Sequence, residues 1–308
     1  MERVLILGSE GFIGKKLQEK LEKENCRVWG YDRTGESSNS NLLIGEFKTE
    51  DRLYDYIRDN GIDTVFHLIS TTYPKEDTSD IPEEIENNVI PTVRLLESIK
   101  SMDGIRLVFV SSGGTVYGES NGGLHNPDEL LHPICGYGAQ KAVIETYMNM
   151  YRERYNLDCR IARLSNVYGF LIQRNRGQGV IPILLMKLME NQPAVMYGDT
   201  IRDYIYMDDA INALYFCGKS DTSFDIINIG TGKPVRLSTL MELIQNCTGK
   251  KFCRIEKQPI RSCDVRECVL DVSETKRLLS WEPAVSLESG ILKIWRQLLD
   301  AEDNTQRL

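Results

Sequence analysis

The sequence lacks any apolar run long enough to cross a lipid bilayer, and it lacks a signal-peptide pattern. Met1-Glu2-Arg3 precedes a short apolar run, and no cleavage-site pattern follows it. A membrane-spanning helix needs about 20 predominantly apolar residues, and a secretory signal also needs a cleavage site. We therefore expect a cytoplasmic protein with no membrane partner.

An excess of positive charge is also lacking. The formal net charge is −8, and the isoelectric point is about 5.2. Nucleic-acid-binding domains usually carry a basic patch or stripe, so we expect no nucleic-acid partner. If the substrate is an anion, a few local cations and backbone N–H groups must hold it.

Paired cysteines are missing as well. The eight cysteines are scattered, and no two form a C-x-x-C pair. Cys253, Cys263 and Cys268 cluster loosely, but without the usual spacing of a zinc site. We expect reduced, mostly buried thiols and no metal site.

What the chain does have is a regular alternation of strand-like and helix-like segments. Its 308 residues, 41% of them hydrophobic, can bury a large core. Strands are predicted at 3–7, 26–31, 63–68, 105–110 and 159–164, and helices at 11–25, 48–60, 85–101, 141–155 and 181–191, with Ser238 as the cap of a later helix. Apolar strands without polar alternation indicate a parallel sheet that is buried on both faces. The sequence predicts an α/β protein with a doubly wound parallel sheet.

The first strand and helix are joined by Gly8-Ser9-Glu10-Gly11-Phe12-Ile13-Gly14. Glycines at this spacing let the backbone turn sharply and approach a pyrophosphate, which the helix N-terminus then stabilises. An ordinary βα turn is the plainer interpretation. The strand before the turn and the helix after it favour a dinucleotide site.

Asp32 stands at the end of the second predicted strand, 18 residues after Gly14. A carboxylate there can accept hydrogen bonds from the adenosine ribose and would repel a 2′-phosphate. It favours NAD over NADP, although Arg33 beside it weakens the preference. We expect NAD.

Tyr137 and Lys141 lie four residues apart, and therefore on one face of a helix. A phenol with a pKa near 10 is a poor base at pH 7. A neighbouring ammonium and a positively charged nicotinamide stabilise the phenolate and lower that pKa. A surface pair without function would have the same spacing, so this motif is informative only when other motifs accompany it.

Such accompanying motifs are present. Besides the glycine turn, the chain carries in order Asp63–Leu68, Ser111–Gly118, Tyr137 with Lys141, Arg163–Gly169 and Arg202-Asp203-Tyr204. This ordered set, from about residue 3 to beyond residue 268, resembles the extended short-chain dehydrogenase/reductase family, in its NAD-dependent sugar-nucleotide epimerase/dehydratase branch. The resemblance implies a Rossmann-type sheet and a smaller, mixed C-terminal domain. It assigns 1–168, with a returning segment near 200–230, to NAD binding, and 169–308 mainly to substrate binding.

The resemblance also implies roles for single residues. It makes Tyr137 and Lys141 catalytic and cofactor-binding, and Asn88 structural or near the cofactor. The other implied cofactor residues are Gly8, Gly11, Phe12, Ile13, Gly14, Asp32, Glu46, Phe47, Leu68, Ser70 and Ser111. The implied substrate residues are Asn166, Arg202, Arg261, Asp264 and Cys268. Two arginines suit a diphosphate, because guanidinium groups form several charge-assisted hydrogen bonds.

The chain departs from relatives at Gly113, where they usually carry Ser or Thr as a partner of the substrate hydroxyl. Ser112, Thr115 or a water molecule would have to supply that group. Family dehydratases and decarboxylases carry carboxylates just before V-Y-G, but this chain has Gly114 and Thr115. Dehydration and decarboxylation are therefore not expected, and the segment is similar to that of the UDP-hexose 4-epimerases.

Cys268 matches a position that, in similar 4-epimerases, walls the pocket around the sugar C2 substituent. A small residue there leaves room for an N-acetyl group, so UDP-N-acetylhexosamines would fit as well as UDP-hexoses. The plainer alternative is a buried apolar residue.

The favoured hypothesis is therefore NAD-dependent 4-epimerisation of a UDP-sugar, as a precursor supply for surface polysaccharide. The resemblance also implies a homodimer through the helices at 85–101 and 141–155. One alternative is a nucleotide-4-keto-sugar reductase, and another is a non-catalytic nucleotide-binding protein.

Overall fold

The computed structural model describes residues 1–35, 40–76, 78–120, 122–170 and 179–306. A central sheet of seven parallel strands has the order β11-β6-β5-β4-β1-β2-β3. Its strands are β1 (Arg3–Leu7), β2 (Arg27–Asp32), β3 (Leu42–Ile44), β4 (Thr64–His67), β5 (Arg106–Ser112), β6 (Asp158–Leu164) and β11 (Ile226–Ile229). The predicted parallel, doubly wound sheet is confirmed, with β3 and β11 as two additional strands at its edges.

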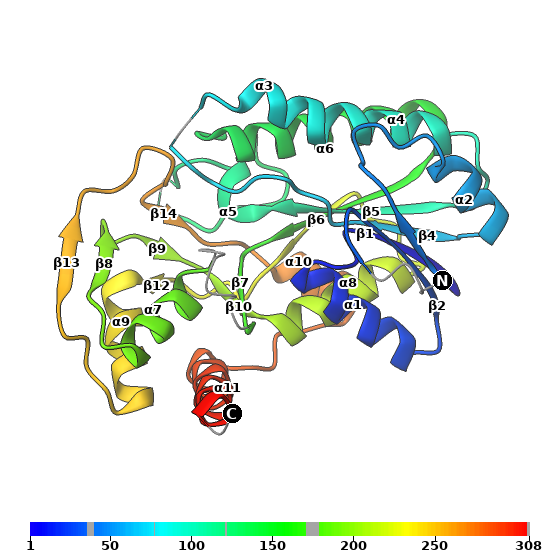
Figure 1. Ribbon diagram of the computed structural model, residues 1–308. Helices are drawn as coiled ribbons and strands as arrows, with labels where there is room; N and C mark the ends of the chain where they lie inside the picture. Colours follow the sequence, from blue (N-terminus) through cyan, green and yellow to red (C-terminus); the bar gives the residue numbers. More distant parts are fainter. Residues whose placement is uncertain (36–39, 77, 121, 171–178, 307–308) are drawn as a thin grey trace.

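Helices cover both faces of this sheet (Figure 1). One face packs against α2 (Leu53–Asn60), α4 (Ile90–Ile99) and α6 (Gly136–Tyr155), and the other against α1 (Phe12–Lys23), α8 (Met207–Lys219) and α10 (Ser273–Leu279). Along β1, Leu5 and Leu7 belong to the core on the α2, α4 and α6 face, and Val4 and Ile6 belong to the core on the α1, α8 and α10 face. Successive side chains of a strand point to opposite faces, so each strand contributes to both cores.

A third core lies apart from the sheet. It is built on α7 (Val180–Met189), α9 (Leu237–Thr248) and α11 (Leu287–Gln306). Short strands accompany these helices: β7 (Asn166–Tyr168) with β10 (Tyr204–Tyr206), β8 (Ala194–Tyr197) with β13 (Ile255–Gln258), and β9 (Ile201–Arg202) between β12 (Val235–Arg236) and β14 (Glu267–Cys268). In the sequence, α8 and β11 come after β7 to β10, yet both belong with the central sheet. Helix α8 packs on one face of it, and β11 forms its edge next to β6. The division into two domains at residue 168 stays a prediction.

Several predicted helices differ in detail. The helix expected at 48–60 begins only at Leu53. The helix expected at 85–101 begins as a π-helical turn (η1, Ile85–Val89) and continues as α4, and a short helix that was not predicted, α3 (Ile81–Glu84), precedes it. The prediction that Ser238 caps a helix is wrong, because α9 already begins at Leu237. The Asp199 carboxylate instead accepts hydrogen bonds from the Ser238 backbone N–H and hydroxyl, at 2.8 and 3.0 Å. The cap is thus supplied by a residue remote in sequence, which no local pattern reveals.

Candidate active site

The carboxyl ends of the sheet strands open into a cavity of about 1340 Å³. Open α/β sheets bind their ligands at this edge. All candidate residues of the sequence analysis line this cavity except Asn88 and Cys268. The fold therefore brings together residues that are as far apart in sequence as Gly8 and Asp264.

The glycine turn forms one end of the cavity. Gly8 has a φ of +91°, which favours glycine, and its carbonyl oxygen accepts the Gly11 N–H at 3.2 Å. A side chain at Gly14 would overlap that same oxygen and come within 2.8 Å of the Ser9 Cα. Within the described residues, no side chain caps α1, and its first turn contains no acidic residue. The free N–H groups of this helix end are therefore available to an anion such as a pyrophosphate.

Asp32 lies beside this turn, at the end of β2. Its carboxylate accepts the Glu10 backbone N–H at 2.9 Å and the Arg33 backbone N–H at 2.7 Å. These two bonds fix the carboxylate at the cavity wall. Together with the glycine turn, it fits the adenosine and diphosphate portions of a dinucleotide.

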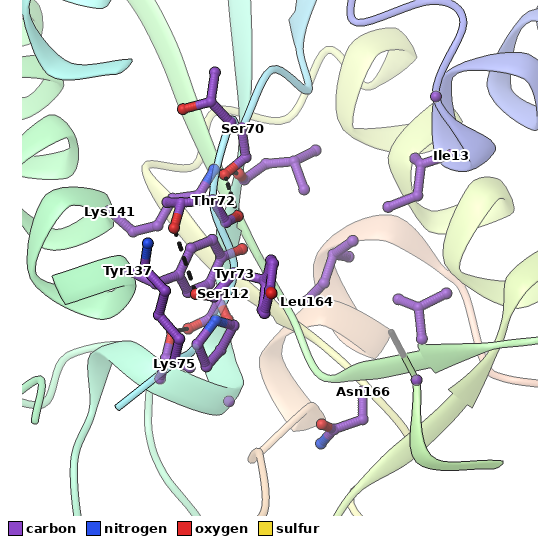
Figure 2. A pocket seen from close by; sticks show the side chains of 18 of the residues that line it. Ile13, Ser70, Thr72, Tyr73, Lys75, Ser112, Tyr137, Lys141, Leu164 and Asn166 are labelled. Carbon is purple, nitrogen blue, oxygen red and sulfur yellow. Dashed lines mark hydrogen bonds between the residues drawn. The ribbon is translucent and has the colours of Figure 1, made fainter. Parts of the chain in front are cut away.

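Tyr137 and Lys141 lie on the first turns of α6, on the same side of the cavity (Figure 2). The Cys135 sulfur accepts the Gly138 N–H at 3.5 Å and caps the helix. Lys141 is buried, and its Nζ donates to the Val110 carbonyl at 3.0 Å and lies 5.8 Å from the centroid of the Tyr137 ring. The Val110 carbonyl near the end of β5 thus holds Lys141 at the cavity wall, on the same helix face as Tyr137, as the spacing predicted.

The surroundings shift both pKa values. Burial raises the pKa of Tyr137 to about 12, while a hydrogen bond with the Ser112 side chain acts to lower it. Burial lowers the pKa of Lys141 to about 8, and the Glu145 carboxylate one turn further along α6 opposes that shift. Without a cofactor, Tyr137 is a neutral phenol at pH 7. A cationic group bound beside it would favour the phenolate.

Three hydroxyl side chains line the cavity together with Tyr137, and they have different partners. The Ser111 hydroxyl donates to the Glu145 carboxylate. The Thr115 hydroxyl donates to the backbone carbonyl of Ser112 at 3.5 Å. Of the three, the Ser112 side chain is the one whose hydrogen bonding acts to lower the pKa of Tyr137.

A buried ion pair beneath this site was not assigned from the sequence. The Arg163 guanidinium donates to both Glu145 oxygens, with a shortest distance of 2.6 Å. It also donates to the Tyr117 hydroxyl and the Pro127 carbonyl, each at 2.8 Å. Tyr117 in turn donates to the Asn228 side chain at 2.6 Å. This network joins β5, β6, α6 and β11 below the catalytic candidates, and only the motifs containing Tyr117 and Arg163 hinted at it.

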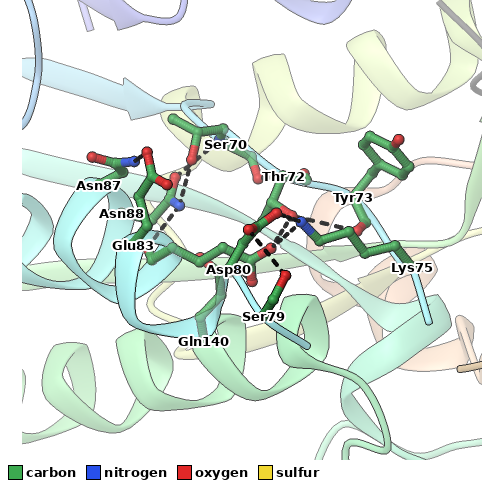
Figure 3. Close-up of polar contacts among 12 residues, drawn as sticks. Ser70, Thr72, Tyr73, Lys75, Ser79, Asp80, Glu83, Asn87, Asn88 and Gln140 are labelled. Atoms are coloured by element: carbon green, nitrogen blue, oxygen red, sulfur yellow. Dashed lines mark hydrogen bonds and ion pairs between the residues drawn. The ribbon is translucent and has the colours of Figure 1, made fainter. Parts of the chain in front are cut away.

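A second polar cluster supports the loop that follows β4 (Figure 3). Asn88, in the π-helical turn, accepts the Thr71 backbone N–H at 3.0 Å and donates to the Thr71 hydroxyl at 2.8 Å. Asn88 itself does not line the cavity. Its contacts are those of a residue that positions the loop.

Glu84 is the centre of the same cluster. Its buried carboxylate accepts the Thr72 hydroxyl at 2.5 Å and the Gln140 amide at 3.2 Å, and lies 3.2 Å from the Lys75 Nζ. Lys75 also pairs with Asp80 at 2.7 Å. The loop is thereby tied to the first turn of α6, where Tyr137 lies. Sequence reasoning missed this group, because none of its members belongs to a motif.

At the opposite end of the cavity, the two candidate arginines are held differently. Arg202 donates to the backbone carbonyls of Ile201 and Val265, at 2.8 and 2.6 Å. Arg261 donates to both oxygens of Asp264, at 2.6 and 3.0 Å. A bound diphosphate would therefore compete with Asp264 for Arg261, whereas the bonds of Arg202 are to uncharged groups.

Cys268 does not form a wall of the cavity, contrary to the expectation. It is 2% exposed, and it packs with Val116, Val265 and Leu270. Its thiol donates to the Gly113 carbonyl at 3.2 Å. The geometry matches the plainer interpretation of a buried apolar residue, so the argument for an N-acetyl group from Cys268 is not supported.

Among the described residues, no cluster of three or more His, Cys, Asp or Glu side chains could hold a metal ion. No helix in the same part of the chain is long and apolar enough to span a membrane.

Comparison with known proteins agrees with this geometry. Residues 4–230 match the NAD dependent epimerase/dehydratase family. The chain belongs to this family. It is 30% identical to the dTDP-4-dehydro-6-deoxyglucose reductase of Escherichia coli, covering 96% of this chain and 97% of that one. It is also 30% identical to the UDP-glucose 4-epimerase of Mycolicibacterium smegmatis, covering 94% and 96%.

Solved structures give the same result. The UDP-glucose 4-epimerase of Thermotoga maritima, solved with UDP-glucose, is 27% identical with a TM-score of 0.87, covering 96% of this chain and 99% of that one. The Thermus thermophilus UDP-glucose 4-epimerase, solved with NAD, is 25% identical with a TM-score of 0.84, covering 94% and 96%. The cofactor of this epimerase/dehydratase family member is NAD, and the glycine turn with Asp32 fits it.

Proposed function

We propose that this protein catalyses the reversible 4-epimerisation of a UDP-sugar through a 4-keto intermediate. The observation that carries the proposal is the placement of Tyr137 and Lys141 in one cavity with the NAD-type glycine turn and two arginines. The whole-length similarity to 4-epimerases supports it. We assign 1–168 and the returning segment to NAD binding, and 169–308 mainly to the sugar nucleotide.

In this mechanism, Tyr137 removes the proton of the sugar C4 hydroxyl, and Lys141 stabilises the phenolate by its charge. Bound NAD supplies a reversible hydride acceptor. Arg202 and Arg261 hold the diphosphate, with Asp264 released from Arg261, and Asn166 lies close to the phosphates. The diphosphate then acts as a pivot while the keto sugar presents its other face.

The absence of carboxylates at 114 and 115 excludes the acid–base pair of the dehydratases at that place. Gly114 and Thr115 both line the cavity. UDP-glucose and UDP-galactose are the first substrates to test. UDP-N-acetylhexosamines follow, since the cavity is large but Cys268 gives no preference.

A homodimer through α4 and α6 is part of the proposal. The large apolar side chains of Ile90, Val143, Tyr147 and Met150 are exposed on these two adjacent helices. Sedimentation of the wild type and of a Val143→Glu/Tyr147→Glu variant tests it. A wild-type monomer would rule out the dimer.

The deciding experiment incubates the purified protein, without added cofactor, with UDP-glucose and separately with UDP-N-acetylglucosamine. Chromatography of the sugar nucleotides should show the 4-epimers, and Tyr137→Phe, which keeps the ring, should abolish them. If protein shown to contain NAD converts neither sugar, the UDP-sugar 4-epimerase proposal is wrong.

The similarity to the Escherichia coli reductase supports a second candidate, a nucleotide-4-keto-sugar reductase. That activity would consume one reduced cofactor for each turnover of a keto sugar, whereas an epimerase regenerates NAD. Net oxidation of NADH with a 4-keto-sugar nucleotide distinguishes the two. A non-catalytic nucleotide-binding protein would show neither activity.

A further inference from the structure

The end of β5 and the turn after it carry three hydroxyl side chains, those of Ser111, Ser112 and Thr115, which line the cavity together with Tyr137. Gly113 lies among them in the sequence. We propose that Ser112 is the hydroxyl partner of Tyr137 during proton transfer, because Leu270 occupies the space that a side chain at residue 113 would need. This inference rests on the proposed function, since it assigns a further catalytic group to the same reaction.

The space at Gly113 is filled by another side chain. A Cβ at this position would lie 2.6 and 2.9 Å from the two methyl groups of Leu270 and 3.3 Å from the Leu164 carbonyl oxygen. Leu270 is 1% exposed and packs with Val116, Tyr117 and Cys268. Because its neighbours are buried, Leu270 cannot easily move aside. A Ser or Thr at 113 would therefore require the Leu270 side chain to shift.

The other two hydroxyls are committed elsewhere. Ser111 precedes Ser112 in β5, and the two side chains point to opposite faces of the strand. The Ser111 hydroxyl accordingly donates to the buried Glu145 carboxylate. Thr115 lies one helical turn after Ser112 and donates to the Ser112 backbone carbonyl. Ser112 lines the cavity beside Tyr137 (Figure 2).

The step balances with Ser112 unchanged. The O–H bond of the C4 hydroxyl breaks and the Tyr137 phenolate takes that proton; bound NAD would accept the hydride from C4 as the C4 carbonyl forms. The Ser112 hydroxyl donates to the phenolate oxygen before the transfer and keeps its own proton throughout. It stabilises the charged form of Tyr137, which agrees with the direction of its influence on the Tyr137 pKa.

The first test compares Ser112→Ala with Thr115→Val in the NAD-containing protein. Hydrogen bonds to charged groups are worth enough that losing one lowers kcat by about 10- to 100-fold. We expect this loss for Ser112→Ala with little change in KM, and an acid limb of the kcat–pH profile that moves to higher pH. A larger loss for Thr115→Val than for Ser112→Ala would overturn the assignment.

A rescue experiment tests the packing argument. Gly113→Ser together with Leu270→Ala, added to Ser112→Ala, supplies both a hydroxyl and the space for it. We expect kcat to recover several-fold, whereas Gly113→Ser without the Leu270 change should give no recovery. Recovery without the Leu270 change would contradict the role of Leu270.

A measurement without turnover separates this inference from the proposed function. The phenolate absorbance of Tyr137 is obtained by subtracting the alkaline titration of Tyr137→Phe from that of the NAD-containing parent protein. Ser112→Ala should raise the pKa so measured, even if no sugar nucleotide is converted. An unchanged pKa refutes the Ser112 assignment, while absent wild-type turnover counts against the 4-epimerase proposal alone.

Discussion

Replacing Arg163 by Met should be among the most destabilising single changes in this protein. Met has a similar length and is apolar, so it fills most of the volume but removes the charge. Glu145 is 1% exposed and would lose every hydrogen bond that Arg163 gives it. Removing one partner of a buried ion pair typically costs about 3–5 kcal/mol. The Tyr117 hydroxyl and the Pro127 carbonyl would also lose a donor.

Urea unfolding of the two proteins at pH 7 measures this free energy. The pH dependence supplies a second check. In Arg163→Met, the buried Glu145 carboxylate lacks its cation, so a proton on it removes an unpaired buried charge from the folded variant. The deficit of the variant relative to the wild type should therefore shrink as pH falls from 7 toward 5.

The control is the double variant Arg163→Met/Glu145→Leu, in which no charge is left unpaired. We expect it to recover most of the lost free energy, because an apolar pair of similar volume often replaces a buried ion pair without loss. A deficit below about 1 kcal/mol for Arg163→Met, the value of an exposed pair, would refute the reasoning. So would a deficit that does not change between pH 7 and pH 5.

Three further outcomes are expected. Epimerase activity should fall as pH rises through the pKa of Lys141, about 8 in the empty protein. Glu145→Gln should move this alkaline limb of the pH–rate profile to lower pH. An unmoved limb would contradict the link between Lys141 and the loss of activity. Cys268→Ala should leave the ratio of rates with UDP-glucose and UDP-N-acetylglucosamine within about twofold, because Cys268 does not line the cavity; a larger shift would restore its assignment as a pocket wall. Gly14→Ala should abolish NAD retention, measured as absorbance released on denaturation, because its Cβ overlaps the Gly8 carbonyl; normal NAD content would show that the turn can relax.

The fold could be predicted because local patterns in the sequence correspond to the strands and helices that the tertiary structure contains. The apolar strands and helical periods before residue 170 reappear as β1, β2, β4, β5 and β6 with their helices. The short β3 was missed because Leu42–Ile44 offers only three residues of pattern. The cap at Ser238 was wrong because Asp199 reaches α9 from a distant turn.

The candidate site was predictable where chemistry demands a spacing along one element. Gly8 to Gly14 must form one turn, and Tyr137 with Lys141 must share one helix face. Position was not predictable where it depends on packing between elements. Whether Cys268 reaches the cavity depends on Leu270 and Val265 around it, and no local spacing contains that relation.

By itself, the sequence determined the class of fold, the dinucleotide turn and the pair of residues suited to proton transfer, because each follows from periodicity or from contacts a few residues apart. Only the tertiary structure decided which hydroxyl faces Tyr137, that Arg261 is paired with Asp264, and that Glu84 and Arg163 anchor the site from below. Apart from the local Arg261–Asp264 pair, these contacts depend on how separate elements pack, and some join residues more than 100 positions apart, as between Gly113 and Leu270. Their geometry is determined by how the cores pack, and packing is a property of the whole fold.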